Sequence, residues 1–162
     1  MGYSKVLYGA AKVELGAPNL AQTASEGWTE LGNIALETVK VNKEAVSLTI
    51  KRDEAGNAVS ELVGDETDRK IEFASHDLSV ENMALAYGGT AASGVYTSPA
   101  AGTIVKKAVK ITDRNGNVAY FPNVAFSCGE QFSFTRKDVG TIVFSGVDLN
   151  PGGFKYTAAS EA

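Results

Sequence analysis

Short runs in which apolar and polar side chains alternate recur along this sequence of 162 residues. The longest run spans residues 38–52, and its second half reads Val46, Ser47, Leu48, Thr49 and Ile50. A period of two with one polar side is typical of an antiparallel strand that has one face in the core. We therefore expect Val46 and Leu48 to face the core, and Ser47 and Thr49 to face away from it.

The same alternation predicts further strands at residues 5–15, 69–75, 104–112, 118–127, 130–137 and 141–147. On two of them the predicted core side holds Ile71, Phe73, Phe132 and Phe134, and the opposite side holds Glu72, Ser133 and Thr135. Asn115-Gly116 lies between two predicted strands and is a strong hairpin signal. Pro122 in the return strand predicts an edge or a bulge.

One short helix is predicted between Ser79 and Gly88. Ser79 is a good N-cap, Leu78 and Met83 have the spacing of a hydrophobic staple, and Gly88 supplies a stop. The order of strands, helix and strands indicates a mainly β (strictly α+β) fold. We predict an antiparallel β-sandwich or barrel with one short helix, forming a single domain over residues 1–162.

Three segments have no regular period, and we predict long loops at about 17–28, 53–68 and 89–103. The last dozen residues, about 150–162, resemble a mobile tail. Long ordered loops in a compact domain usually serve a function.

Composition and motifs do not indicate catalysis or a bound cofactor. The net charge of −4 lacks the concentrated basic surface of a nucleic-acid clamp. One Cys (Cys128) and one His (His76) cannot supply a four-ligand zinc site, although folding could still bring the two together as a pair. We predict a protein that is not an enzyme and has no cofactor and no metal.

The sequence also lacks a targeting signal. Its N-terminus has no apolar core of a signal peptide, and no stretch approaches the ~20 apolar residues of a membrane span. We therefore expect a cytoplasmic chain without membrane insertion.

Trp28 and the Lys106-Lys107 pair each have a structural and a functional interpretation. Trp28 could anchor a sugar or a partner, but a lone Trp more often closes a loop onto a core. The two lysines more often protect a sheet edge than bind nucleic acid.

Two stretches form a distinctive strand-to-helix pattern. Gly27-Trp-Thr-Glu-Leu-Gly precedes the long strand and the acidic loop, and Arg69-Lys-Ile-Glu-Phe precedes Leu78-Ser-Val-Glu-Asn-Met-Ala-Leu-Ala-Tyr-Gly. This pattern resembles the major tail tube proteins of long-tailed bacteriophages. The similarity covers about residues 26–89, and the later hairpins match in order only.

The resemblance implies a subunit of homo-hexameric rings with a shared inner β-barrel. The rings would stack into a tube in the virion tail, assembled in the host cytoplasm, through which viral DNA enters the host. The implied partners are copies of the same chain, tail tip and terminator proteins and, in sheathed tails, a sheath. DNA would pass without specific binding, because small hydroxyls and acids do not hold it as lysines do.

The family places a long inter-ring stacking loop between two strands, and residues 53–68 match that position. The expected stacking residues are Val59, Leu62, Val63, Asp65 and Glu66. From the alternation, we expect lumen-facing side chains at Ser47, Thr49, Glu72, Ser133 and Thr135. Arg69-Lys70 and Lys106-Lys107 depart from an acidic channel, so either they point to neighbouring subunits or this assignment of faces is wrong there.

The main alternative is a monomeric β-sandwich module that binds carbohydrate or a cell-surface ligand. Loops 17–28 and 89–103 would form its site, with Trp28 or Tyr96 as a platform. A third interpretation is a tube component of a related injection or secretion machine.

Overall fold

The computed structural model describes residues 10–32, 34–35, 38–64, 67–126 and 140–159. It confirms a mainly β chain of antiparallel strands, with one α-helix in that part of the chain. The strand predicted at 130–137, with Phe132, Ser133, Phe134 and Thr135, lies outside the described residues, as do Cys128 and the start of the strand predicted at 5–15.

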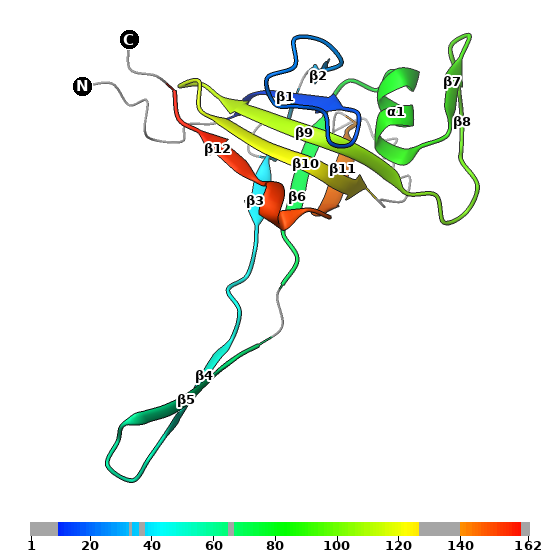
Figure 1. Ribbon diagram of the computed structural model, residues 1–162. Coiled ribbons are helices and arrows are strands. Elements are labelled where there is room, and N and C mark those ends of the chain that lie inside the picture. Colours follow the sequence, from blue (N-terminus) through cyan, green and yellow to red (C-terminus); the bar gives the residue numbers. More distant parts are fainter. Residues whose placement is uncertain (1–9, 33, 36–37, 65–66, 127–139, 160–162) are drawn as a thin grey trace.

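One antiparallel sheet forms the body of the molecule (Figure 1). Its strands neighbour one another in the order β2 (Thr29–Leu31), β1 (Ala10–Gly16), β9 (Val105–Asp113), β10 (Val118–Phe126), β11 (Ile142–Asp148), β6 (Lys70–Ser75) and β3 (Lys40–Asn42). A short strand, β12 (Lys155–Thr157), pairs with β10 beside this path. Two hairpins stand outside the sheet: β4 (Leu48–Arg52) with β5 (Ala58–Val63), and β7 (Thr90–Ala92) with β8 (Val95–Thr97).

The body sheet curves until both of its ends meet the same segment of chain. At one end β2 pairs with β1, at the other β3 pairs with β6, and between them Ile34 bridges to Ser75. The Ala35 amide donates to the Ala74 carbonyl at 2.8 Å. Residues 29–42 therefore join the two ends of the sheet around one core, as in a small barrel or a tightly curved sandwich.

The core is built from side chains on the inner face of this sheet. Its largest fully buried members include Leu15, Leu31, Ile71, Phe73, Phe121, Phe126, Ile142 and Phe144. Phe73 stacks on Phe144 with ring centroids 4.8 Å apart and meets the edge of Phe126 at 6.0 Å. Ile71 and Phe73 are buried and Glu72 between them is exposed, which confirms the facing predicted for this strand.

The predicted hairpin around Asn115-Gly116 is formed by β9 and β10. Pro122 lies in the register shift between Phe121 and Val124, so the predicted bulge is also confirmed. Beyond this bulge β10 exchanges neighbours: its first half pairs with β12 and its second half with β11.

The same five-residue turn, Asp-x-x-Gly-Asn, closes both the β9–β10 and the β4–β5 hairpins. In residues 113–117 and in residues 53–57, the Asp N–H donates to the Asn carbonyl at 2.9 Å and the Asn N–H donates back to the Asp carboxylate. Gly56 and Gly116 both have φ +86°, a conformation that favours glycine. The turn therefore sets the register of each hairpin locally.

The helix α1 (Val80–Tyr87) begins where predicted. The Ser79 hydroxyl accepts from the Asn82 N–H at 3.3 Å, and Gly88, with φ +81°, follows the last turn. The hairpin β7–β8 continues from it and packs beside it (Figure 1).

Three predictions about irregular segments are corrected. Six of the sixteen residues of the loop predicted at 53–68 form a strand, β5, and the long strand predicted at 38–52 is divided into β3 and β4. The loop predicted at 89–103 contains the β7–β8 hairpin. The segment predicted as a tail at 150–162 contains a 3-10 turn, η2 (Pro151–Gly153), and β12, which is paired and not free.

The segment 17–28 contains no strand or helix, as expected, and folds over the outer face of the body sheet. Its Leu20 carbonyl accepts a hydrogen bond from the Tyr120 hydroxyl. Trp28 meets the Tyr120 ring edge-on at 6.1 Å, and the Lys110 ammonium lies 4.5 Å from its ring centroid. Trp28 therefore closes this loop onto the body.

Candidate assembly site on the β4–β5 arm

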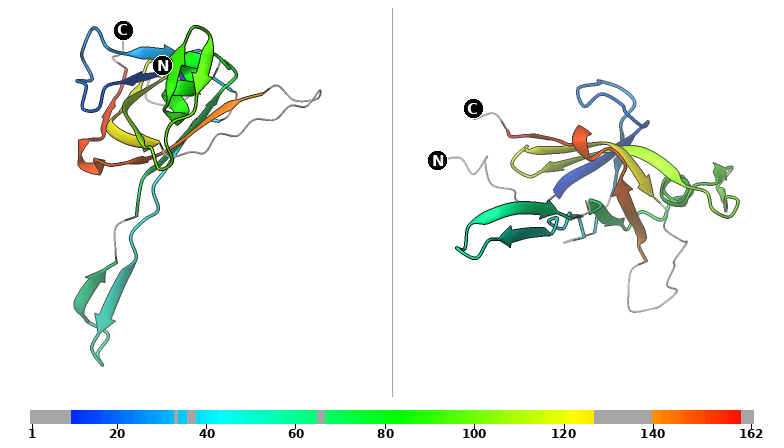
Figure 2. Two further views of the ribbon diagram at one scale, coloured as in Figure 1. Left: turned by 90° about the vertical axis from the view of Figure 1, so that its right-hand side faces the viewer. Right: turned by 60° about the horizontal axis from the view of Figure 1, so that its bottom comes forward.

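The β4–β5 hairpin projects away from the body (Figures 1 and 2). We call residues 48–63 the arm. Every residue from Lys40 to Val63 is exposed, and β4 and β5 make a sheet of their own. The arm therefore carries its side chains in solvent on both faces, unlike the central strands β1, β9, β10, β11 and β6 of the body.

The register of the arm sorts its side chains into two faces. Leu48 lies opposite Val63 and Ile50 opposite Glu61, which places these four side chains on one face. Arg52 and Ala58 form the next pair on this face; Val59, the extra residue at the bulge, shares it by alternation, since it lies two residues before Glu61. We call this the apolar face.

The opposite side is the hydroxyl face. Thr49 lies opposite Leu62 and Lys51 opposite Ser60. Ser47 lies two residues before Thr49 and therefore on the same side. Its backbone carbonyl accepts a hydrogen bond from the Gly64 N–H at 2.7 Å, which extends the pairing of the two chains by one step. The two faces of the arm thus differ in chemistry as the alternation of residues 46–50 predicts.

The prediction that Val46 and Leu48 are in the core is wrong for this chain by itself. The exposed fractions of Val46, Leu48 and Ile50 are 36%, 58% and 40%, and those of Val59 and Val63 are 62% and 68%. The alternation correctly separates the two faces, but the arm leaves the body before its apolar face meets the core. A single two-stranded hairpin is marginally stable in water, so a face of this kind gains from being covered.

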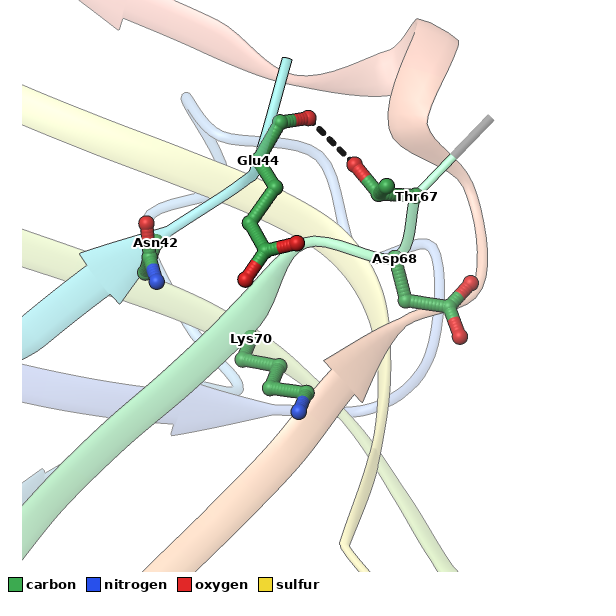
Figure 3. A pocket seen from close by; sticks show the side chains of 5 residues that line it. All are labelled: Asn42, Glu44, Thr67, Asp68 and Lys70. Carbon is green, nitrogen blue, oxygen red and sulfur yellow. Dashed lines mark hydrogen bonds between the residues drawn. The ribbon is translucent and has the colours of Figure 1, made fainter. Parts of the chain in front are cut away.

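The root of the arm is polar. Asn42 and Glu44 on the outgoing chain, with Thr67, Asp68 and Lys70 on the returning chain, line a hollow of about 300 Å³. The Thr67 hydroxyl donates to the Glu44 carbonyl and ties the two chains together (Figure 3). Neighbouring acids and a lysine do not by themselves make a binding site, and we assign this hollow no ligand.

The predicted stacking residues lie together but divide between the two faces. Val59 and Val63 are on the apolar face, whereas Leu62, 52% exposed, is on the hydroxyl face. Asp65 and Glu66 lie outside the described residues.

The predicted lumen residues do not form one surface. Ser47 and Thr49 are on the arm, Glu72 is on the body, and Ser133 and Thr135 lie outside the described residues. Glu72 is exposed and lies between Lys40 of β3 and Ser145 of β11 in the sheet register. Lys70, two residues away on the same side, is exposed too, so this body surface is not acidic.

The four basic residues noted in the sequence are placed differently from one another. Arg69 points into a cluster of aromatic rings and pairs with Asp148, while Lys70 shares the outer face with Glu72. Lys106 and Lys107 lie where β9 extends beyond its pairing with β1, which begins at Ala108. This placement agrees with the protected-edge interpretation of these two lysines.

The platforms of the alternative binding module are not equivalent. Trp28 is covered by Lys110 on its face and by Tyr120 at its edge, and Tyr96 packs against the core cluster. His76 is exposed and its Nδ1 lies 3.5 Å from the Gly140 carbonyl oxygen, while Cys128, its possible partner, lies outside the described residues.

Two features of this region escaped the sequence analysis. The turn at the tip of the arm repeats the Asp-x-x-Gly-Asn pattern of residues 113–117, a signal that was present in residues 53–57. The pairing of Arg69 with Asp148 joins residues that are 79 positions apart, and no local pattern indicates it.

Within the part of the chain that the structure describes, no three His, Cys, Asp or Glu side chains gather in a way that could hold a metal ion. Among the same residues, no helix is long and apolar enough to cross a membrane. A scan against models of protein families finds no match to this chain, and a search of curated proteins finds none either.

Proposed function

We propose that this chain is a structural subunit of a phage-type tail tube, and that it assembles with copies of itself through the arm. The observation that carries the proposal is the apolar face of a projecting two-stranded hairpin. Leu48, Val59 and Val63 are each more than half exposed there, although each could be buried in a contact with another molecule.

A second copy of the chain is the partner that best fits this face. The ends of the body sheet meet at residues 29–42, so the body offers short free edges, whereas both outer edges of the arm are unpaired among the described residues. An arm that packs on a different surface of the next copy makes a head-to-tail contact, which generates rings or filaments. The six-fold ring and the stacking of rings come from the resemblance to tail tube proteins alone.

The two faces of the arm suggest a division of roles. The apolar face would pack on the neighbouring copy, and the hydroxyl face, with Ser47, Thr49, Ser60 and one lysine, Lys51, would then be left to line the bore. Small hydroxyls do not release counterions from DNA as lysines do, so DNA would slide past them. We keep Glu72 as a predicted lumen residue; it lies on the body between Lys40 and Lys70, whereas the hydroxyl face of the arm carries the single lysine Lys51 among its hydroxyls.

The subunit would be assembled in the host cytoplasm into a virion tail, with tail tip and terminator proteins at the ends of the tube. It would act without catalysis and without a cofactor.

Size-exclusion chromatography and negative-stain microscopy across a range of concentrations test this proposal. A tube subunit forms rings or filaments at high concentration, and the apolar arm face becomes protected from hydrogen exchange. A monomer at every concentration would refute the proposal and would favour the binding module. For the bore, Ser47→Lys with Thr49→Lys should slow DNA ejection while tubes still form.

A further inference from the structure

Arg69 lies at the point where the returning chain of the arm enters the body. It directly precedes β6, and its backbone carbonyl accepts the Asp148 N–H at 2.9 Å. Its side chain therefore lies between two structures: the arm on one side and the C-terminal segment 148–157 on the other.

The Arg69 side chain makes a buried ion pair. Its Nη1 donates to Asp148 Oδ2 at 2.7 Å, and the Asp148 side chain is fully buried while that of Arg69 is 15% exposed. The other carboxylate oxygen, Oδ1, accepts the Asn150 N–H at 2.9 Å. A carboxylate buried this completely depends on such partners, because leaving it unpaired is costly.

The same guanidinium lies against two aromatic rings. Its Cζ is 4.6 Å from the ring centroid of Phe154 and 5.9 Å from that of Phe121, and these rings stack on each other at 5.0 Å. Phe154 directly precedes β12, which pairs with β10 over three residues. The face of the Arg69 guanidinium thus contacts Phe154, just before β12, and its edge contacts Asp148, the last residue of β11.

We infer that Arg69 is a positioning residue that holds the arm in one direction and couples that direction to the C-terminal strand β12. The root of the arm is otherwise polar and exposed, with the Thr67–Glu44 hydrogen bond joining its two chains, and the pair with Asp148 anchors the returning chain to the body. A planar guanidinium suits this place because it donates to a carboxylate and stacks on a ring at the same time, which a lysine ammonium does less well.

The consequence for assembly rests on the proposed function. If the arm docks on a second copy, a fixed direction lowers the entropy lost on binding. A force on the arm would then be transmitted through Arg69 to Phe154 and loosen β12, and loss of β12 would in turn release the arm.

The inference can be tested on the unassembled full-length chain with two spin labels. One label replaces Ser60 on the arm and the other replaces Glu30, which is exposed on β2, in a Cys128→Ser background. We expect one narrow distance distribution in the parent protein, and a distribution at least twice as broad in Arg69→Lys and Arg69→Ala. Lys106→Ala, which removes an exposed positive charge on β9 outside the root of the arm, is the control and should leave the distribution narrow.

Coupling to β12 has a separate readout in hydrogen exchange. We expect the backbone amides of residues 155–157 to exchange at least about tenfold faster in Arg69→Lys than in the parent protein. A factor of about ten in the exchange rate is what the loss of one charge-assisted contact would produce. Phe154→Leu removes one stacked ring and keeps the ion pair, so it should speed exchange at β12 and broaden the arm distances less than Arg69→Lys does. This variant also keeps the test available if Arg69→Ala does not fold.

Unchanged arm distances and unchanged exchange at β12 in Arg69→Lys would overturn the inference, whether or not the protein forms tubes. A lower melting temperature with unchanged arm distances would show a merely structural role and would overturn it too. Conversely, failure of the parent protein to assemble would count against the proposed function and leave the positioning role of Arg69 intact.

Discussion

Replacing Leu48 and Val63 by threonine should weaken assembly strongly and leave the fold unchanged. The two side chains lie directly opposite each other on the apolar face, with exposed fractions of 58% and 68%. Threonine keeps the preference for a strand but places a hydroxyl where a contact would be apolar.

The expected magnitude follows from these exposed fractions. Full burial of a Val or Leu side chain is worth about 1.5–3 kcal/mol, so covering the exposed part of each would contribute about 1–2 kcal/mol. Losing both contributions costs about 2–4 kcal/mol for each contact between copies. At roughly 1.4 kcal/mol for each factor of ten, the critical concentration for assembly should rise by about 30-fold to 1000-fold.

Sedimentation of polymers over a concentration series, with grids for microscopy, measures this critical concentration. Leu62→Thr is the matched control, because Leu62 is adjacent in sequence and 52% exposed but belongs to the hydroxyl face. Its critical concentration should stay within about threefold of the parent value, since a change of less than about 0.7 kcal/mol is expected for a residue outside the contact. The reasoning fails if Leu48→Thr/Val63→Thr assembles as the parent does, or if Leu62→Thr has an equal effect.

Three further predictions concern the body and the turns. Gly146→Ala should lower the free energy of unfolding by about 1–3 kcal/mol in urea titrations, because the new Cβ would lie 2.6 Å from Val124 Cγ1 and 2.9 Å from the Phe126 ring; an unchanged midpoint would show that this contact relaxes freely. Asp113→Ala should lower the free energy of unfolding by about 2–3 kcal/mol, because the buried Asp113 carboxylate accepts from the Asn115 N–H, the Asn117 N–H and the Asn117 side chain. Asp53→Ala in the exposed turn of the arm should lower it by less than about 1 kcal/mol, and equal losses in the two variants would contradict the role of burial. Burial raises the pKa of the Tyr120 hydroxyl, so the unfolded chain loses this proton at a lower pH than the folded chain does. The free energy of unfolding should therefore fall as the pH rises above about 10. Thermal melts at about pH 9 to 11.5 should show a smaller fall in Tyr120→Phe than in the parent protein.

Period-two alternation predicted five strands of the body, β1, β6, β9, β10 and β11, and both faces of the arm, but not β2 or β12. It identified Ile71, Glu72 and Phe73 correctly, and it separated Leu48 from Thr49. It did not predict what covers an apolar face, because the period reports which side chains share a side and not what lies opposite them. The core position expected for Leu48 was wrong for this reason.

Long-range contacts account for most of what the sequence did not predict. The pairing of β12 with β10 and the ion pair between Arg69 and Asp148 join residues far apart in the chain, and neither has a local signal. The arm is a different case, because the Asp-x-x-Gly-Asn turn at its tip is local. Recognition of that turn in residues 53–57 would have converted a predicted loop into a predicted hairpin.

The closed turn at the tip of the arm has a consequence for the order of folding. All pairings of the arm join residues at most 15 positions apart, from Leu48 to Val63, whereas β1 must find β9 about a hundred residues later. Local hairpins form in about 1–10 μs, and sheets built from distant strands form far more slowly. In a newly made chain the arm can therefore form transiently before the body sheet is complete, and it becomes a lasting feature only once the body holds its root.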